Sequence, residues 1–241
     1  MAEQSKLSIK IITLFPKFIE DFVENFGIVR KAVKNKLLEI KAVDLRKFGI
    51  DKRGTVDGRP YGGGVGMVLR ADVLYRAIQK SANNKSQNSK TRIILLTPQG
   101  KKFDQKTAKH LSKYDNLVLV SGRYEGFDER IRKFVDEEVS VGNYVLMGGE
   151  LPALTIAEAV MRLRPGVLGK DESADKESFT DNLLEYPQYT KPEVLRIKDK
   201  GLRIKQLRVP KILLTGHHKN IEEWRKKEAV KKTKKRRPDL I

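Results

Sequence analysis

The chain has 241 residues, of which 39% are hydrophobic and 34% are charged. This composition predicts a globular protein with one large domain or two smaller ones. No apolar run approaches the roughly 20 residues that span a bilayer, so we expect no contact with a membrane. Zero cysteines exclude disulfides and thiolate metal sites. The polar start, MAEQSKLSIK, lacks a secretory apolar segment and favours a cytoplasmic location.

The excess of positive charge indicates a negatively charged binding partner. The formal net charge is +19, and residues 183–241 hold 18 Lys and Arg against 7 Asp and Glu. A local basic surplus of this kind favours a nucleic acid. The alternative is a lysine-rich surface that serves only solubility.

The hydrophobic pattern predicts strands that alternate with helices over most of the chain. In chain order we expect strand Leu7–Leu14, helix Phe18–Val33 broken near Gly27, strand Glu39–Val43, an exposed loop over Arg46–Gly66, helix Val73–Ser81 with Asp72 as its N-cap, a polar turn at Asn83–Lys90, strand Arg92–Leu96, helix Asp104–Ser112, strand Leu117–Val120, helix Glu129–Phe134, strand Glu138–Val141 and helix Leu154–Leu163. This order indicates an α/β fold with a mostly parallel sheet and helices on both faces.

The alternation stops after a polar stretch, Lys170–Asn182, which has the composition of an interdomain linker. Beyond it, Ile221–Lys234 predicts a basic helix. We therefore expect a first domain over 1–168, a linker over 169–182 and a small, mainly helical domain over 183–241.

Several familiar sites are absent from the sequence. There is no G-x-G-x-x-G after a strand, no P-loop and no G-x-S-x-G, and the three histidines match no zinc pattern. Two glycine-rich turns, Gly122–Gly126 and Gly142–Gly149, instead follow strand-like runs. With the Leu96–Gly100 turn they would place three strand ends around one crevice, where open α/β sheets bind ligands. Tight turns without a ligand are the alternative.

These turns belong to a longer series of sequence motifs that closely resembles the bacterial tRNA (guanine-N1-)-methyltransferases, which belong to the knotted SPOUT class. The matching blocks are IITLFP (11–16), RPYGGGVGM (59–67), LTPQGKKF (96–103), GRYEGFDER (122–130), RPGVLG (164–169), YPQYTKPEV (186–194), LLTGHH (213–218) and RRPDL (236–240). The resemblance implies a trefoil knot in the first domain and a homodimer whose pocket combines one chain's knot with the partner's C-terminal domain.

The resemblance also implies that S-adenosylmethionine binds in the knotted loops. The residues expected to hold it are Thr97, Pro98, Gly122, Tyr124, Glu125, Val141, Gly142, Asn143, Tyr144, Val145, Leu146, Gly148 and Gly149. Asn143 stands where the family usually has aspartate, which leaves backbone contacts but removes a carboxylate. Glu125 would face the methionine end of the cofactor or a magnesium ion; a solvated loop acid is the alternative.

Two side chains are candidates for catalysis by the same resemblance. Arg162 would stabilise the negative charge that reaches guanine O6 when the N1 proton leaves; a helix-end arginine that complements the helix dipole is the alternative. Glu177 would be the general base, although the family has aspartate there. Glutamate keeps the carboxylate but adds a methylene and a rotatable bond. Asp175, Glu172 and Asp171 lie nearby as substitutes.

The tRNA contacts are expected in the exposed loop and along the basic helix. They are Arg59, Tyr61, His218, Arg225, Lys231, Lys232, Lys234, Lys235 and Arg236. Arg53 and Gly58 depart from the usual family residues in that loop. A solvated basic tail is the alternative for the helix.

The resemblance thus implies methyl transfer to N1 of the guanine immediately 3′ of the tRNA anticodon, position 37. The base would be flipped into the pocket because its N1 is enclosed in the stacked loop. The alternative is a non-catalytic RNA-binding module, or a related knotted enzyme that modifies another RNA position. The glutamate at position 177 supports that alternative.

Overall fold

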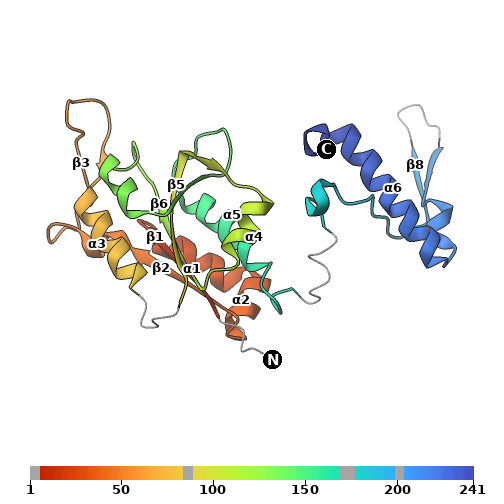
Figure 1. Ribbon diagram of the computed structural model, residues 1–241, viewed down its shortest axis with the longest axis horizontal. Coiled ribbons are helices and arrows are strands. Elements are labelled where there is room, and N and C mark those ends of the chain that lie inside the picture. Colours follow the sequence, from red (N-terminus) through yellow and green to blue (C-terminus); the bar gives the residue numbers. More distant parts are fainter. Residues whose placement is uncertain (1–5, 84–88, 169–176, 199–203) are drawn as a thin grey trace. The chain divides into compact units, whose positions relative to one another are not determined.

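A computed structural model describes residues 6–83, 89–168, 177–198 and 204–241 (Figure 1). The chain divides into two compact units, Met1–Asp171 and Glu172–Ile241. Within the described ranges, none of the helices is both long enough and apolar enough to cross a membrane.

The first unit is built on a five-stranded sheet in the order β2-β1-β6-β5-β7, and every neighbouring pair in it is parallel. Its strands are β1 (Leu7–Thr13), β2 (Leu38–Asp44), β5 (Thr91–Lys102), β6 (Asn116–Ser121) and β7 (Glu137–Ser140). Two further segments, β3 (Asp57–Gly58) and β4 (Val68–Leu69), form a small antiparallel ladder. The mostly parallel α/β architecture expected from the alternating pattern is confirmed.

Helices cover both faces of this sheet. They are α1 (Pro16–Asn25), α2 (Gly27–Lys34), α3 (Ala71–Ala82), α4 (Gln105–Leu111) and α5 (Glu150–Met161), with short 3₁₀ helices at Leu45–Phe48 and Glu129–Phe134. The break expected near Gly27 separates α1 from α2. Several expectations were wrong in detail. The loop expected to be exposed over Arg46–Gly66 contains most of the 3₁₀ helix Leu45–Phe48 and strand β3, and Val56 in it is buried. Glu129–Phe134 is 3₁₀ rather than α, and Arg70 rather than Asp72 is the N-cap of α3, with Asp72 in its first turn.

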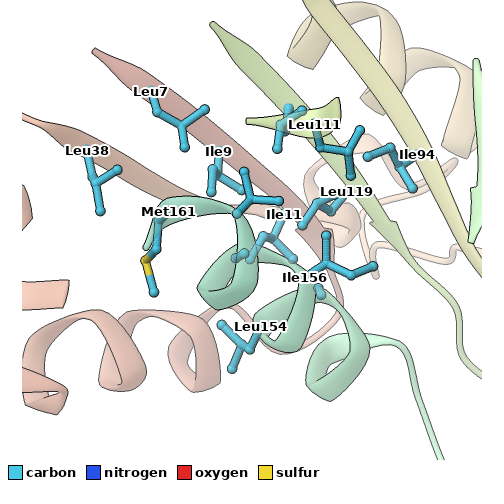
Figure 2. Close-up of a cluster of buried hydrophobic side chains, with 14 of the residues drawn as sticks. Leu7, Ile9, Ile11, Leu38, Ile94, Leu111, Leu119, Leu154, Ile156 and Met161 are labelled. Atoms are coloured by element: carbon cyan, nitrogen blue, oxygen red, sulfur yellow. The ribbon is translucent and has the colours of Figure 1, made fainter. Parts of the chain in front are cut away.

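Strand alternation produces a core on each face of the sheet. On one face, Ile9 and Leu119 pack with α1, α2, α4 and α5. Figure 2 shows Leu154, Ile156 and Met161 of α5 beside the side chains of β1. On the other face, Ile12 and Val120 pack with α3 and the two 3₁₀ helices. Because successive side chains of a strand point to opposite faces, the same strands supply both cores.

The second unit contains a β-hairpin and a long helix. Its elements are β8 (Val194–Lys198), β9 (Ile204–Arg208), α6 (His218–Arg236) and 3₁₀ turns at Thr180–Asn182, Lys211–Leu214 and Pro238–Leu240. The strands pair antiparallel, with Leu195 opposite Leu207. The expectation of a mainly helical unit missed this hairpin. The expected basic helix is present and extends beyond Ile221–Lys234 at both ends.

Candidate active site

Three adjacent strands, β6, β5 and β7, end at one edge of the sheet. β5 runs straight as far as Leu96, and its register with β7 then shifts so that both Leu96 and Lys101 pair with Val139. The residues between them, Thr97–Gly100, bulge out of the strand. Glycine is needed at position 100 in this bulge, because the Cβ of any other residue would lie 2.5 Å from the Glu138 carbonyl carbon and would clash with it. A bulge of this kind re-aims backbone next to a site.

A cavity of about 360 Å³ lies at these strand ends. A volume of this size is within the range of small-ligand sites. It is lined by Leu96, Thr97, Pro98, Gln99, Gly122, Arg123, Tyr124, Glu125, Gly126, Phe127, Glu129, Arg132, Val139, Ser140, Val141, Gly142, Tyr144, Val145, Leu146, Met147, Gly148, Gly149 and Pro152. Twelve of the thirteen expected cofactor residues are in this lining, and Asn143 is not.

Two turns form most of the wall: the first pocket turn, Gly122–Phe127, and the second pocket turn, Val141–Gly149. They meet where the Gly149 N–H donates to the Gly122 carbonyl at 2.8 Å. A Cβ on Gly149 would lie 2.7 Å from the Gly122 nitrogen, and one on Gly122 would lie 2.8 Å from the Phe127 ring. Glycine at 149 therefore lets the two turns approach this closely, and glycine at 122 leaves room for the Phe127 ring within the first turn.

The start of the second pocket turn is fixed by the end of β7. The Ser140 hydroxyl donates to the Gly142 carbonyl at 3.0 Å, and the Gly142 N–H donates to the same hydroxyl oxygen at 3.3 Å. The Tyr144 hydroxyl donates to the Val141 carbonyl at 3.3 Å. A Cβ on Gly142 would collide with the Tyr144 ring. Beyond this anchored start, Val145 and Met147 are almost fully exposed.

A buried carboxylate supports the end of the same turn. Glu150, the first residue of α5, is only 2% exposed. It accepts hydrogen bonds from the Thr13 hydroxyl at 2.8 Å and from Arg123 Nε at 3.0 Å. The Arg123 guanidinium also donates to the Met147 carbonyl at 3.2 Å and lies 4.4 Å from the Phe15 ring centre. A buried charge needs such pairing.

The sequence analysis missed Arg123, Glu150 and Thr13. No local pattern identifies them, because Arg123 and Thr13 lie 27 and 137 residues away from the Glu150 that they bond. α5 itself begins at Glu150, four residues before the expected start at Leu154.

Neither catalytic candidate is among the residues that line the cavity. Arg162 is the C-cap of α5, whose opposite end begins at the cavity. Twelve helical residues span about 18 Å, so Arg162 does not line this cavity. Glu177 is half-buried in the second unit. Asp171, Glu172 and Asp175 are outside the described residues.

Glu177 precedes a tightly held turn. The Ser178 hydroxyl accepts from the Glu185 N–H at 3.1 Å, and the Phe179 N–H donates to the Leu183 carbonyl at 2.7 Å. Phe179, Asp181 and Asn182 all have positive φ. Non-glycine residues seldom adopt this conformation, and several together indicate a segment held in place by its surroundings.

Some of the expected RNA-contacting residues are exposed, and others contact their own unit. Tyr61 is fully exposed in its loop, and Lys231, Lys234, Lys235 and Arg236 are exposed on α6. A shallow groove on α6 is lined by Lys226, Lys227, Val230, Lys231, Lys234 and Lys235.

Arg225 and Lys232 face their own unit instead. The Arg225 guanidinium lies 4.7 Å from the Tyr186 ring centre, and Lys232 Nζ donates to the Glu185 carbonyl at 2.9 Å. Their positive charges thus help to hold α6 against the segment after the linker. His218 and Arg59 are exposed at the start of α6 and in the loop.

The open parallel sheet, with a glycine-lined cavity at three neighbouring strand ends, places the chain among the α/β proteins that bind a ligand at their strand ends. Residues 7–241 match the family described as tRNA (Guanine-1)-methyltransferase TrmD. The chain belongs to this family of methyltransferases.

Individual relatives agree over nearly the whole length. The tRNA (guanine-N(1)-)-methyltransferase of Mycoplasmopsis synoviae is 46% identical over 236 residues, which cover 98% of this chain and 97% of the relative. Its counterpart in Sulfurihydrogenibium sp. is 46% identical over a stretch that covers 98% of this chain and 87% of the relative. That of Thermus thermophilus is 43% identical, covering 96% and 90%.

Proposed function

We propose that this protein transfers a methyl group from S-adenosylmethionine to N1 of the guanine immediately 3′ of the tRNA anticodon, position 37. The observation that carries the proposal is the glycine-lined cavity at the ends of β5, β6 and β7 in a chain of this family. S-adenosylmethionine supplies the methyl group as an electrophile. The protein's own residues bind the cofactor and the tRNA, orient the guanine toward the methyl group and remove its N1 proton.

The cavity has the properties that a nucleoside cofactor needs. Part of its wall is main chain, because five of the lining residues are glycines, whose polar groups are only the main-chain N–H and C=O. Such groups can bond the edge of an adenine without any charged residue. Glu125 and Glu129 add carboxylates to the lining, which suit the positively charged end of the cofactor. The loss of the family's aspartate at Asn143 does not affect a wall of this kind.

Magnesium is the less supported component. It prefers octahedral oxygen ligands, and within the described ranges no three His, Cys, Asp or Glu residues gather into a metal-binding group. Glu125 alone does not make a protein-held site. A magnesium ion here would need further ligands from the substrates.

Glu177 is the proposed general base. The turn that follows it is held by Ser178 and Phe179, so the end of the linker at Glu177 is anchored on one side. Anchoring limits the backbone entropy that is lost when the base is placed, while the extra rotatable bond of glutamate must still be ordered. Removal of the guanine N1 proton moves negative charge to O6, and Arg162 would stabilise that charge.

Because Arg162 lies at the far end of α5 from the cavity of its own chain, we propose a homodimer in which the arginine serves the partner's pocket. Two exposed apolar side chains support a protein interface there: Met147 lines the cavity, and the Phe15 ring centre lies 4.4 Å from the guanidinium of the lining residue Arg123. A trefoil knot through the pocket turns, as in the SPOUT class, is part of the same proposal.

The second unit is proposed to hold tRNA through the exposed lysines of α6, with the loop around Tyr61 as a further contact. A row of lysines binds phosphates without reading sequence, and the recognised base would be flipped out of its stack. We place the reaction in the cytoplasm, where tRNA is modified.

Methyl transfer itself tests the proposal. The protein would be incubated with S-adenosylmethionine labelled in the methyl group and with unmodified tRNA transcripts. We expect label in a transcript with guanine at position 37 and background label when adenine replaces it. Equal labelling of both transcripts, or of neither, would reject the proposal.

A further inference from the structure

The loop Arg59–Met67, here called the glycine loop, is joined directly to the first pocket turn. The Glu125 N–H donates to the Met67 carbonyl at 3.0 Å. One step further, the Leu69 N–H donates to the Gly126 carbonyl at 2.9 Å, and the Asp128 N–H donates to the Leu69 carbonyl at 3.0 Å. The end of the loop and the cavity wall therefore form one short parallel ladder.

A side-chain contact reinforces the ladder. Gly66 has φ +85°, and a Cβ on it would lie 2.5 Å from both Cγ and Oε1 of Glu125. The Glu125 side chain thus lies directly against the backbone of Gly66, in space that exists only because this residue is glycine. Glu125 also lines the cavity.

The other part of the loop faces solvent. Tyr61 is fully exposed, and Val65 is 91% exposed. The β3–β4 ladder closes the base of the loop by pairing Gly58 with Val68. The glycine loop is therefore a projection whose tip is free to meet a partner and whose base touches the cavity.

We propose that the glycine loop positions Glu125 in the cavity, and that binding of RNA at the loop tip is thereby coupled to binding of the cofactor. This rests on the proposed function, which places cofactor in the cavity and RNA at Arg59 and Tyr61. A partner that holds the loop in one conformation also holds Glu125, because Glu125 contacts Gly66 and Met67 at the base of the loop. By linkage, RNA then raises the affinity for the cofactor and the cofactor raises the affinity for RNA by the same factor.

Two glycine substitutions separate this contact from backbone strain. Gly66→Ala and Gly62→Ala each force alanine into φ +85°, but a Cβ at Gly62 meets nothing within 4 Å. Calorimetric titration with S-adenosylhomocysteine, which cannot react, should show an affinity about tenfold weaker for Gly66→Ala and within about twofold of wild type for Gly62→Ala. Equal effects of the two substitutions would overturn the proposal.

A double-mutant cycle identifies the partner side chain. If Gly66→Ala acts by displacing Glu125, it should have little further effect once the side chain is shortened by Glu125→Ala. The loss caused by Gly66→Ala should then fall from about tenfold to less than about twofold in that background. An undiminished loss would mean that Glu125 is not the group being positioned. Melting temperatures of all variants control for unfolding.

Coupling is measured by repeating the titration with saturating unmodified tRNA transcript. Wild type should bind S-adenosylhomocysteine at least about fivefold more tightly with the transcript than without it, and Gly66→Ala should lose most of this difference. A wild-type protein that binds both ligands independently would overturn the coupling alone. A wild-type protein that does not bind S-adenosylhomocysteine would overturn the proposed function together with this inference.

Discussion

Arg123 and Glu150 lie 27 residues apart and pair across the base of the cavity, with Nε and Oε2 3.0 Å apart. The pair joins the two pocket turns, since Arg123 is in the first and Glu150 directly follows the second. The same guanidinium holds the Met147 carbonyl. A charge pair with a buried carboxylate thus fixes the shape of a wall that is otherwise glycine and exposed turn.

Thr13 completes this arrangement and offers a clean substitution. Thr13→Val keeps the shape of the side chain but removes its hydrogen bonds with Glu150 and with the Phe15 N–H. Leaving a buried carboxylate with one partner fewer should cost about 1–3 kcal/mol of unfolding free energy. Urea denaturation measures this. Thr13→Ser retains the hydroxyl and should lose less than about 1 kcal/mol; a similar loss for both variants would show that the hydroxyl is unimportant.

Gly149 should be intolerant of any side chain. In Gly149→Ala the new Cβ meets main-chain atoms of Ser121 and Gly122, which cannot rotate away. Overpacking of this kind costs about 1–3 kcal/mol and should separate the two pocket turns. S-adenosylmethionine should then no longer raise the melting temperature, as a ligand of the native state otherwise does.

Gly27→Ala is the matched control, because a Cβ there meets nothing within 4 Å and lies in α2. Its response to S-adenosylmethionine should equal that of wild type. An unchanged ligand response in Gly149→Ala would argue against a cofactor between the turns.

The exposed lysines of α6 should determine the salt dependence of tRNA binding. Replacing Lys231, Lys234 and Lys235 with glutamine should weaken binding and reduce the slope of log K against log salt by up to about one for each phosphate that the variant no longer binds. Lys232→Gln is the control on the same helix. Since Lys232 bonds the Glu185 carbonyl, its replacement should lower stability and leave the slope nearly unchanged. An unaltered slope in the triple variant would indicate a solvated helix face.

Glu177→Gln tests the general base. The change keeps size and hydrogen bonding but removes basicity, so single-turnover methyl transfer should fall about 10²–10⁴-fold while affinities for cofactor and tRNA stay nearly constant. Glu177→Asp restores the family residue and should remain active. Asp175→Asn should be mild. A silent Glu177→Gln with a severe Asp175→Asn would place the base two residues earlier.

Local patterns in the sequence predicted the parallel sheet and the three strand ends at the cavity, whereas the individual residues expected to hold the cofactor came from the family resemblance. Strand periodicity located β5, β6 and β7, and the glycines that follow them marked the wall. The pairing of Arg123 with Glu150 is a contact between turns, and no local pattern specifies it. The hairpin was missed because Val194–Lys198 mixes charged and apolar residues, as an exposed two-stranded ribbon does, instead of showing a buried face.

The position of the methyl group tests the central claim most directly. A methyl on guanine N1 blocks base pairing, so reverse transcription of the treated tRNA should stop next to nucleotide 37. We expect this stop with wild-type protein and S-adenosylmethionine, and none without the cofactor or with the Gly149→Ala variant. A stop at another nucleotide, or full-length copying of tRNA treated with folded wild-type protein, would contradict the account.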